Sequence, residues 1–97
     1  MPSRLSPKSI KAHYDNLTDW ELADDLKSIS KTIQFDSFEE AMRFVVRIAE
    51  IATEMNHHPN WSNSYKMVSI TLTTFSINGL SELDFRLAQQ IDKTLET

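Results

Sequence analysis

Cysteine is absent from this 97-residue chain, and glycine occurs only once. Without cysteine the chain has no disulfide framework and no metal site built on thiolates. Basic residues are also in the minority, since ten lysines and arginines stand against fourteen acidic residues and give a net charge of −4. A nucleic-acid partner requires a clustered positive surface, and the lysines here are scattered among acids, so we expect no direct contact with nucleic acid.

Long hydrophobic runs are missing as well. No stretch approaches the roughly 20 apolar residues of a membrane-spanning helix, and residues 1–5 lack the apolar run of a signal peptide. We therefore expect a cytoplasmic protein with no membrane partner. Because 40% of the residues are hydrophobic and a quarter are charged, the composition is that of a globular protein. Residues 1–97 are predicted to form one domain around one core.

Apolar periodicity and capping residues predict the order of helices and strands. Ser37 with Glu40 and Ser81 with Asp84 have the spacing of helix-capping residues. The expected elements are a helix at 6–17, strands at 20–22 and 27–35, a helix at 37–56, strands at 60–63 and 66–75, a turn at 78–79 and a helix from 81. Two hairpins separated by a helix indicate an α+β fold, in which three helices pack on one face of a four-stranded antiparallel sheet.

The helix at 37–56 is unusually apolar. Its main stripe comprises Phe38, Ala41, Met42, Val45, Ile48, Ala49, Ala52 and Met55, and it is widened by Phe44, Val46 and Ile51. We expect the sheet to cover one side of this helix, and a partner subunit or a neighbouring helix to cover another. In the strand at 66–75, by contrast, Val68, Ile70 and Leu72 alternate with mostly hydroxyl-bearing residues, which predicts one buried face.

Residues 56–61, Asn-His-His-Pro-Asn-Trp, hold two of the three histidines. Histidine exchanges a proton near neutral pH without special tuning, so His57 and His58 are candidates for acid–base catalysis. Pro59 disfavours helical geometry at the residue before it and so marks the end of the long helix. Trp61 could form the wall of a site for a planar ligand, although tryptophan in a small domain more often serves packing, which applies equally to Trp20.

Other interpretations of the histidine pair remain open at this point. A histidine at the C-terminal end of a helix interacts favourably with the helix dipole, which would be a purely structural role. A metal site is less favoured, because adjacent residues point in different directions and His13 is predicted on another helix. A serine hydrolase is the least favoured, since no serine lies in a glycine-rich nucleophile motif.

Taken together, these residues resemble the pterin-4a-carbinolamine dehydratase family. The resemblance is carried by Asn56-His57-His58-Pro59-x-Trp61, Tyr65, the segment 70–74 (Ile-Thr-Leu-Thr-Thr) and Gly79-Leu80-Ser81-Glu82-x-Asp84, and it extends upstream to Trp20 and the segment 35–38. It implies the same α+β fold, and association through sheet edges and long helices into homodimers or homotetramers.

The resemblance also implies a reaction, which is the loss of water from a 4a-hydroxytetrahydropterin to give a quinonoid dihydropterin without a metal or organic cofactor. Such a reaction needs an acid for the leaving oxygen and a base for the N5 proton, and two imidazoles can supply both. His57 and His58 are the catalytic candidates, with His58 slightly favoured as the acid. The candidate substrate-binding residues are Trp20, Asn56, Pro59, Trp61, Thr73, Thr74, Phe75 and Ser76.

Two positions depart from the family pattern. The family typically has a third active-site histidine, or in some members a tryptophan, where this chain has Phe75, and usually an acidic residue where it has Thr53. Phenylalanine can stack on a ring but cannot transfer a proton. The sequence therefore indicates a dehydratase with an altered site. The alternatives are a pterin-binding protein without turnover and a protein-interaction relative of the coactivator or assembly-factor kind.

Overall fold

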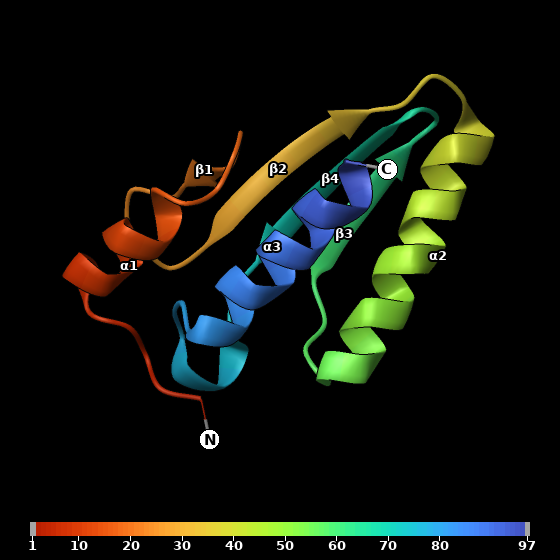
Figure 1. Ribbon diagram of the computed structural model, residues 1–97. Helices are drawn as coiled ribbons and strands as arrows, with labels where there is room; N and C mark the ends of the chain where they lie inside the picture. The colour runs from red at the N-terminus through yellow and green to blue at the C-terminus, as the bar shows by residue number, and fades with distance from the viewer. Residues whose placement is uncertain (1, 97) are drawn as a thin grey trace.

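Helices and strands alternate in the order that the sequence predicts (Figure 1). The computed structural model describes residues 2–96. The elements are α1 (Pro7–Tyr14), β1 (Glu21–Leu22), β2 (Ile29–Gln34), α2 (Phe38–Met55), β3 (Asn60–Ser64), β4 (Met67–Leu72), a 3₁₀ turn η1 (Phe75–Ile77) and α3 (Glu82–Leu95).

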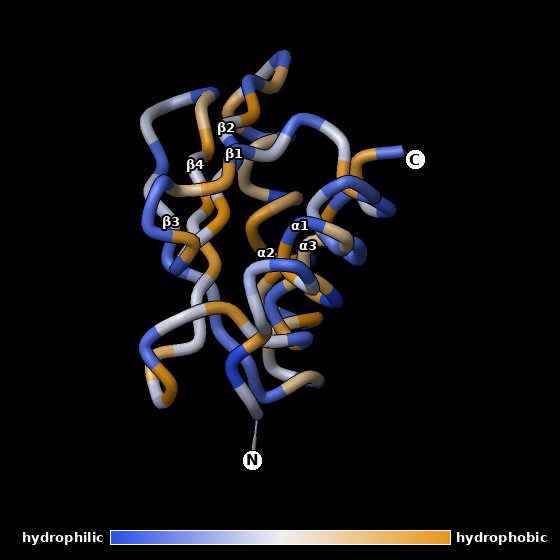
Figure 2. Tube along the Cα trace, turned by 90° about the vertical axis from the view of Figure 1, so that its left-hand side faces the viewer, coloured by the Kyte–Doolittle hydropathy of each residue, from blue (hydrophilic) through white to orange (hydrophobic). Residues whose placement is uncertain are grey.

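The strands form one antiparallel sheet in the order β1-β2-β4-β3. Figure 2 shows the sheet on one side and all three helices on the other, so the predicted α+β architecture is confirmed. The predicted alternation of buried and accessible residues along β4 is also confirmed. Val68, Ile70 and Leu72 are buried against the helices. The residues between them, Met67, Ser69 and Thr71, are not buried. In the part of the chain that the structure describes, no helix has the length and apolar character to span a bilayer.

Serine side chains cap the helices, as predicted. Ser37 Oγ accepts the Glu40 amide at 3.1 Å, and the Glu40 carboxylate in turn accepts the Asp36 amide at 3.3 Å. At α3 the capping box is complete, since the Asp84 carboxylate accepts the Ser81 amide at 3.0 Å. The same Asp84 carboxylate also bonds to His57, as described below for the candidate site.

Two predicted boundaries were wrong. The first helix ends at Tyr14 and not near residue 17, because the amides of Asn16 and Leu17 bond to carbonyls only three residues back. The last strand ends at Leu72 and not at residue 75. The Thr74 amide donates to Gly79 O at 2.8 Å, so the chain leaves the sheet and closes a turn there.

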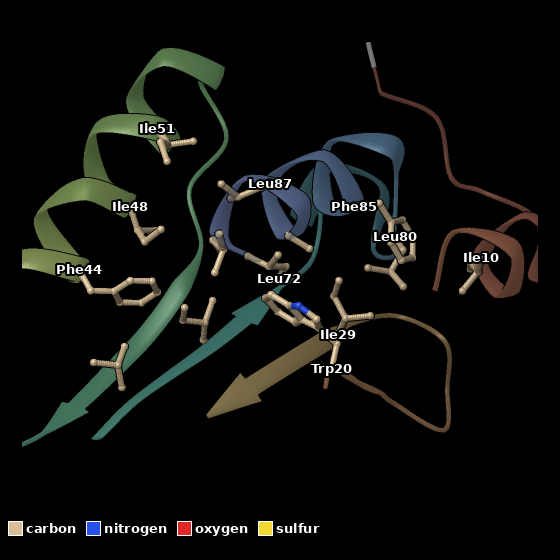
Figure 3. Close-up of a cluster of buried hydrophobic side chains, with 14 of the residues drawn as sticks. Ile10, Trp20, Ile29, Phe44, Ile48, Ile51, Leu72, Leu80, Phe85 and Leu87 are labelled. Carbon is tan, nitrogen blue, oxygen red and sulfur yellow. The ribbon is translucent and has the colours of Figure 1, made fainter. Parts of the chain in front are cut away.

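The buried face of α2 is rotated from the predicted stripe. Its fully covered residues are Ala41, Phe44, Ile48, Ile51 and Ala52, whereas Phe38 is 41% exposed. Phe44, Ile48 and Ile51 point between the sheet and α3, where they approach Leu72 and Leu87 (Figure 3). On α3 the face formed by Phe85, Ala88 and Ile91 is buried, and Leu87 joins it on the side of α2.

Left-handed backbone conformations occur only at residues other than glycine within 2–96. Positive φ values are found at Asp19, Leu26, Asn56, Tyr65 and Asn78. The predicted turn at 78–79 is present, but Asn78 and not Gly79 takes the left-handed conformation. Tyr65, between β3 and β4, stacks on Phe38 with ring centroids 6.4 Å apart and an interplanar angle of 11°.

Candidate functional site

A pocket of about 540 Å³ lies where α2 ends and the chain leaves β4. Both segments are at the same end of the molecule, the lower end in Figure 1. The lining residues come from four parts of the chain: Pro2; Met55, Asn56, His57, His58, Pro59 and Asn60; Thr73, Thr74, Phe75 and Ser76; and Leu83. Eight of the ten site residues predicted from the sequence are therefore brought together.

The end of α2 places the first histidine. Asn56 adopts the left-handed conformation (φ 52°, ψ 41°), the His57 amide bonds to Ala52 O at 3.0 Å and the Asn56 amide to Thr53 O at 3.1 Å. These are the two hydrogen bonds of a Schellman motif, which satisfies the last carbonyls of the helix with backbone amides. The imidazole of His57 is consequently not needed as a helix cap.

The His57 side chain instead bonds to a buried carboxylate. His57 Nε2 lies 2.6 Å from Asp84 Oδ1, and Asp84 is fully buried. The other carboxylate oxygen, Oδ2, accepts from Thr74 Oγ1 at 2.7 Å and from the Ser81 amide at 3.0 Å. Since the Thr74 hydroxyl proton goes to Asp84, Ser81 Oγ donates to Thr74 Oγ1 at 2.7 Å. Three donors thus converge on one carboxylate.

This network determines which nitrogen of His57 is available to the pocket. A carboxylate can only accept, so Nε2 carries a hydrogen and Nδ1 of the neutral ring has a free lone pair. Nδ1 makes no hydrogen bond within the described chain, and no buried side-chain nitrogen or oxygen there lacks a partner, so Nδ1 must reach accessible surface. His57 itself lines the pocket, and Nδ1 is its ring nitrogen without a partner among the described residues.

The second histidine has a different environment. His58 lines the same pocket but is exposed, whereas His57 is only 8% exposed. The two are the only titratable side chains among the lining residues. The pocket wall is otherwise apolar or carries neutral amides and hydroxyls, so it offers proton transfer and hydrogen bonding without a fixed charge.

Phe75 is not at the end of a strand, contrary to the sequence-based expectation. It begins η1, and its ring is 74% exposed at the pocket rim. Ser76 follows it on the rim, while Thr73 and Thr74 lie at the base of the same turn. Thr53 does not line the pocket, and its hydroxyl donates to Ala49 O at 2.8 Å within α2.

Neither tryptophan lines this pocket. Trp20 is 4% exposed, and its indole N–H donates to both oxygens of Asp92, at 2.9 and 3.1 Å. Lys31 completes this cluster, since Nζ lies 2.9 Å from Asp92 Oδ1 and 5.6 Å from the Trp20 ring centroid. Trp61 is on the helix-facing side of β3, opposite Ile70 and near Phe44.

We expect a Trp20→Phe variant to lose about 1 kcal/mol of folding free energy, because Asp92 loses its indole donor but keeps Lys31. Ligand affinity at the pocket should not change. Urea unfolding and calorimetric titration measure the two quantities separately. If the variant binds the ligand more weakly but is equally stable, Trp20 contributes to substrate binding, as the sequence suggests.

Sequence reasoning missed the functional position of Asp84. The capping pattern identified it as the third residue of α3, and nothing in that pattern indicates contact with a histidine 27 positions earlier. The same is true of Leu83 and Pro2, which reach the pocket only through the tertiary fold. Met55 and Asn60 could have been included, since Met55 directly precedes the histidine motif and Asn60 lies within it.

Among residues 2–96, no three histidine, aspartate or glutamate side chains are grouped so that they could hold a metal ion. His13 lies on α1, as predicted, where Nδ1 is 3.0 Å from Ser9 O and the ring meets the edge of Phe85 at 5.1 Å. Another surface hollow, of about 440 Å³ between α2 and α3, contains Glu40, Arg43 and Arg47 and none of the candidate residues.

Sequence comparison relates nearly the whole chain to one family. The family described as "Pterin 4 alpha carbinolamine dehydratase" matches residues 3–94. A protein of Rhizobium meliloti (strain 1021) named "Putative pterin-4-alpha-carbinolamine dehydratase" is 42% identical over 95 residues, which are 98% of this chain and 91% of the relative. A protein of the same name from Rhizobium leguminosarum bv. trifolii is 44% identical over 90 residues, with 93% and 89% covered.

Solved structures with the same fold include members of this family. The crystal structure of a transcriptional coactivator/pterin dehydratase from Brucella melitensis superimposes with a TM-score of 0.89 at 32% identity, and covers 94% of this chain and 97% of that one. A pterin dehydratase-like protein identified as a RuBisCO assembly factor in the alpha-carboxysome has a TM-score of 0.68 at 23% identity, covering 78% and 88%. The second likeness shows a shared fold only.

Proposed function

Since this chain belongs to the pterin-4-alpha-carbinolamine dehydratase family, we propose that it dehydrates a 4a-hydroxytetrahydropterin to the quinonoid dihydropterin. In this reaction the C4a–O bond breaks, the hydroxyl leaves as water, and loss of the N5 proton allows a C4a=N5 double bond to form. The observation that carries the proposal is the pairing of His57 with buried Asp84 at 2.6 Å on the wall of a pocket that also contains His58.

In this proposal His57 is the base. Its Nε2–H donates to Asp84, which fixes the tautomer and leaves Nδ1 to take the N5 proton. The resulting imidazolium would be stabilised by the carboxylate 2.6 Å away. Asp84 does not touch the ligand, so its role is to position and stabilise His57.

His58 is the acid that protonates the leaving hydroxyl. Its side chain has no carboxylate partner in the described structure, and it is exposed next to the pocket, where it can exchange protons with water between turnovers. An exposed imidazole that exchanges protons with water is a suitable general acid. The two histidines therefore have different roles because their surroundings differ.

The rest of the pocket suits a neutral, flat, polar ring system. Its volume of about 540 Å³ is in the range of small-ligand sites. Asn56, Thr73 and Ser76 provide amide and hydroxyl groups for the hydrogen-bonding edge of a pterin, and the exposed Phe75 ring can stack on its face. No lysine or arginine lines the pocket to pair with a phosphate or carboxylate, which favours an uncharged substrate.

The direct test is to follow loss of a freshly generated 4a-carbinolamine by absorbance, with and without the purified protein. We expect the decay to accelerate in proportion to protein concentration. If the rate equals the uncatalysed rate while calorimetry detects a dihydropterin bound, the protein binds pterins without turnover. If neither is seen, the site has another ligand.

We expect a Phe75→His variant to raise kcat/KM at least about tenfold, because it places a proton-transfer group where the family typically has one. Phe75→Asn is the control, since asparagine can donate and accept hydrogen bonds as histidine does but does not titrate. Initial rates of carbinolamine dehydration measure both variants. Equal rates for the histidine and asparagine variants would mean that the pocket does not present position 75 to the reacting atoms.

A non-catalytic role is the second candidate, and the exposure of Phe75 favours it. An aromatic ring that is 74% exposed, at a position where the family usually has a histidine, suits contact with another protein better than proton transfer. A complex that forms equally well with and without both histidines, together with an uncatalysed dehydration rate, would support this role as an interaction module.

We also propose self-association into a homodimer or homotetramer. β3 is an edge strand, and all five of its residues are exposed. It carries neither proline nor charge, the features that usually prevent pairing with another strand. Val46 on α2 is 60% exposed and offers a second apolar contact.

A further inference from the structure

The N-terminal segment preceding α1 lies against the turn that contributes to one wall of the pocket. The Leu5 amide donates to Leu80 O at 3.0 Å, so residues 2–5 run beside the turn between β4 and α3. In Figure 1 this red segment lies at the same end of the molecule as that blue-green turn. Pro2 continues past the turn and lines the pocket itself.

Arg4 makes the principal polar contact of this segment. Its guanidinium donates to Ile77 O through Nη2 at 2.7 Å and Nε at 3.2 Å, and Nη2 also reaches Asn78 O at 3.2 Å. These carbonyls lie at the end of η1, the turn that begins with Phe75. A planar guanidinium can bridge two successive carbonyls in this way, and an ammonium cannot do so with the same geometry.

Gly79 provides the space for Arg4. A Cβ built on Gly79 would lie 3.1 Å from Arg4 Nε and 3.5 Å from its Cδ and Cγ, and these are the three nearest atoms. The φ angle of Gly79 is not positive, so an alanine there would strain no backbone. A side chain at the only glycine in the sequence would therefore press on Arg4 and shift it by a few tenths of an ångström.

We infer that Arg4 is a positioning residue for the pocket: it fixes the 75–78 turn so that Phe75 and Ser76 keep their places at the rim. Within residues 2–96 no other side chain bonds to the Ile77 or Asn78 carbonyl, and the rest of the turn is closed by the amides of Ile77, Asn78 and Gly79 to the carbonyls of residues 74 and 75 and by the Thr74 amide and Thr73 hydroxyl to Gly79 O. Its near end is anchored by Thr74, which bonds to Asp84. The expected effect of Arg4 on pterin affinity rests on the proposed function.

The test compares Arg4→Ala with Lys8→Ala, which removes the same charge from an exposed position on α1. We expect Arg4→Ala to raise the Kd of a dihydropterin and the KM about five- to tenfold, with kcat within about twofold, because the His57–Asp84 pair is untouched. The Kd and KM of Arg4→Lys should lie between those of Arg4→Ala and those of the unaltered protein. Lys8→Ala should behave like the unaltered protein. A fall in kcat with unchanged KM would overturn the inference.

A Gly79→Ala variant tests the same contact from the side of the turn. It should weaken dihydropterin binding in the unaltered protein by displacing Arg4, and have no further effect when Arg4 is already alanine, because the clashing atoms are gone. Additive effects of the two substitutions would contradict a shared contact.

Hydrogen exchange separates this inference from the proposed function. In Arg4→Ala the amides of Ile77, Asn78 and Gly79 should exchange faster, with no change at the amides of α2. This readout needs no ligand. If no pterin binds the unaltered protein but the turn loosens, the proposed function fails and the structural role of Arg4 stands. If the turn exchanges at the same rate in both proteins, the role of Arg4 is wrong.

Discussion

Replacing His58 by alanine is expected to lower kcat for carbinolamine dehydration by about 10²–10⁴, and to change the free energy of unfolding by less than about 0.5 kcal/mol. His58 is exposed and forms no hydrogen bond or ion pair to another described residue, so its removal leaves no buried group without a partner. Single-turnover rates and urea unfolding of the same preparation measure the two quantities. A loss of activity in this variant is therefore a loss of chemistry and not of structure.

His57→Ala provides the contrast to that variant. It should lower kcat by a similar factor, but it should also cost about 1–3 kcal/mol of folding free energy, because the buried Asp84 Oδ1 loses the one donor that it has among residues 2–96. If His58→Ala instead loses about 0.3–1 kcal/mol of stability and no activity, His58 serves the helix dipole and the acid must be sought elsewhere.

Asp84→Asn is expected to destabilise the protein by about 2–3 kcal/mol and lower its melting temperature by about 10–20 °C. Both carboxylate oxygens accept hydrogen bonds: Oδ1 from His57, and Oδ2 from Thr74 and the Ser81 amide. An amide NH₂ on the Oδ2 side would face the Thr74 and Ser81 donors, so asparagine must turn its NH₂ toward His57, and three charge-assisted hydrogen bonds are replaced by weaker neutral ones. Activity should fall as well, since an amide nitrogen facing His57 would favour the opposite tautomer.

The control for this variant is Glu82→Gln, which removes one negative charge from the same first turn of α3 at an exposed position. It should cost no more than about 0.3–1 kcal/mol, the contribution of an acid to the helix dipole. Thermal unfolding followed by circular dichroism compares the two variants. Equal losses would show that Asp84 acts through its charge at the helix end and not through its hydrogen bonds.

Much of the fold could be predicted because local signals agree with the tertiary structure. Ser37 and Ser81 cap the helices that they were expected to cap, and the alternation around Val68 and Ile70 identified the buried face of β4. Boundaries were less predictable. The strand prediction continued to Phe75 because Thr73 and Thr74 favour strands, whereas the Thr74–Gly79 pairing that ends the strand is not visible in local sequence.

The candidate site could be predicted only in part. The tandem histidines and the family resemblance pointed to residues 56–59 and 73–76, which line one pocket, although Phe75 was expected in a strand and lies in a turn. The pairing with Asp84 joins residues 27 positions apart, and the contact of Arg4 with Ile77 joins residues 73 positions apart. Such pairs depend on how α3 and the N-terminal segment pack, and periodicity and capping rules carry no information about that.

The stacking of Tyr65 on Phe38 has a consequence for the opposite end of the molecule. Tyr65 holds a left-handed conformation that is costly for a residue with a side chain, so contact with the start of α2, not local preference, supports the bend between β3 and β4. A slip of one residue in this pairing would exchange the two faces of β3. Because Asn60 begins that strand and lines the pocket, a slip at the Tyr65 bend would also change which residue stands at the pocket wall.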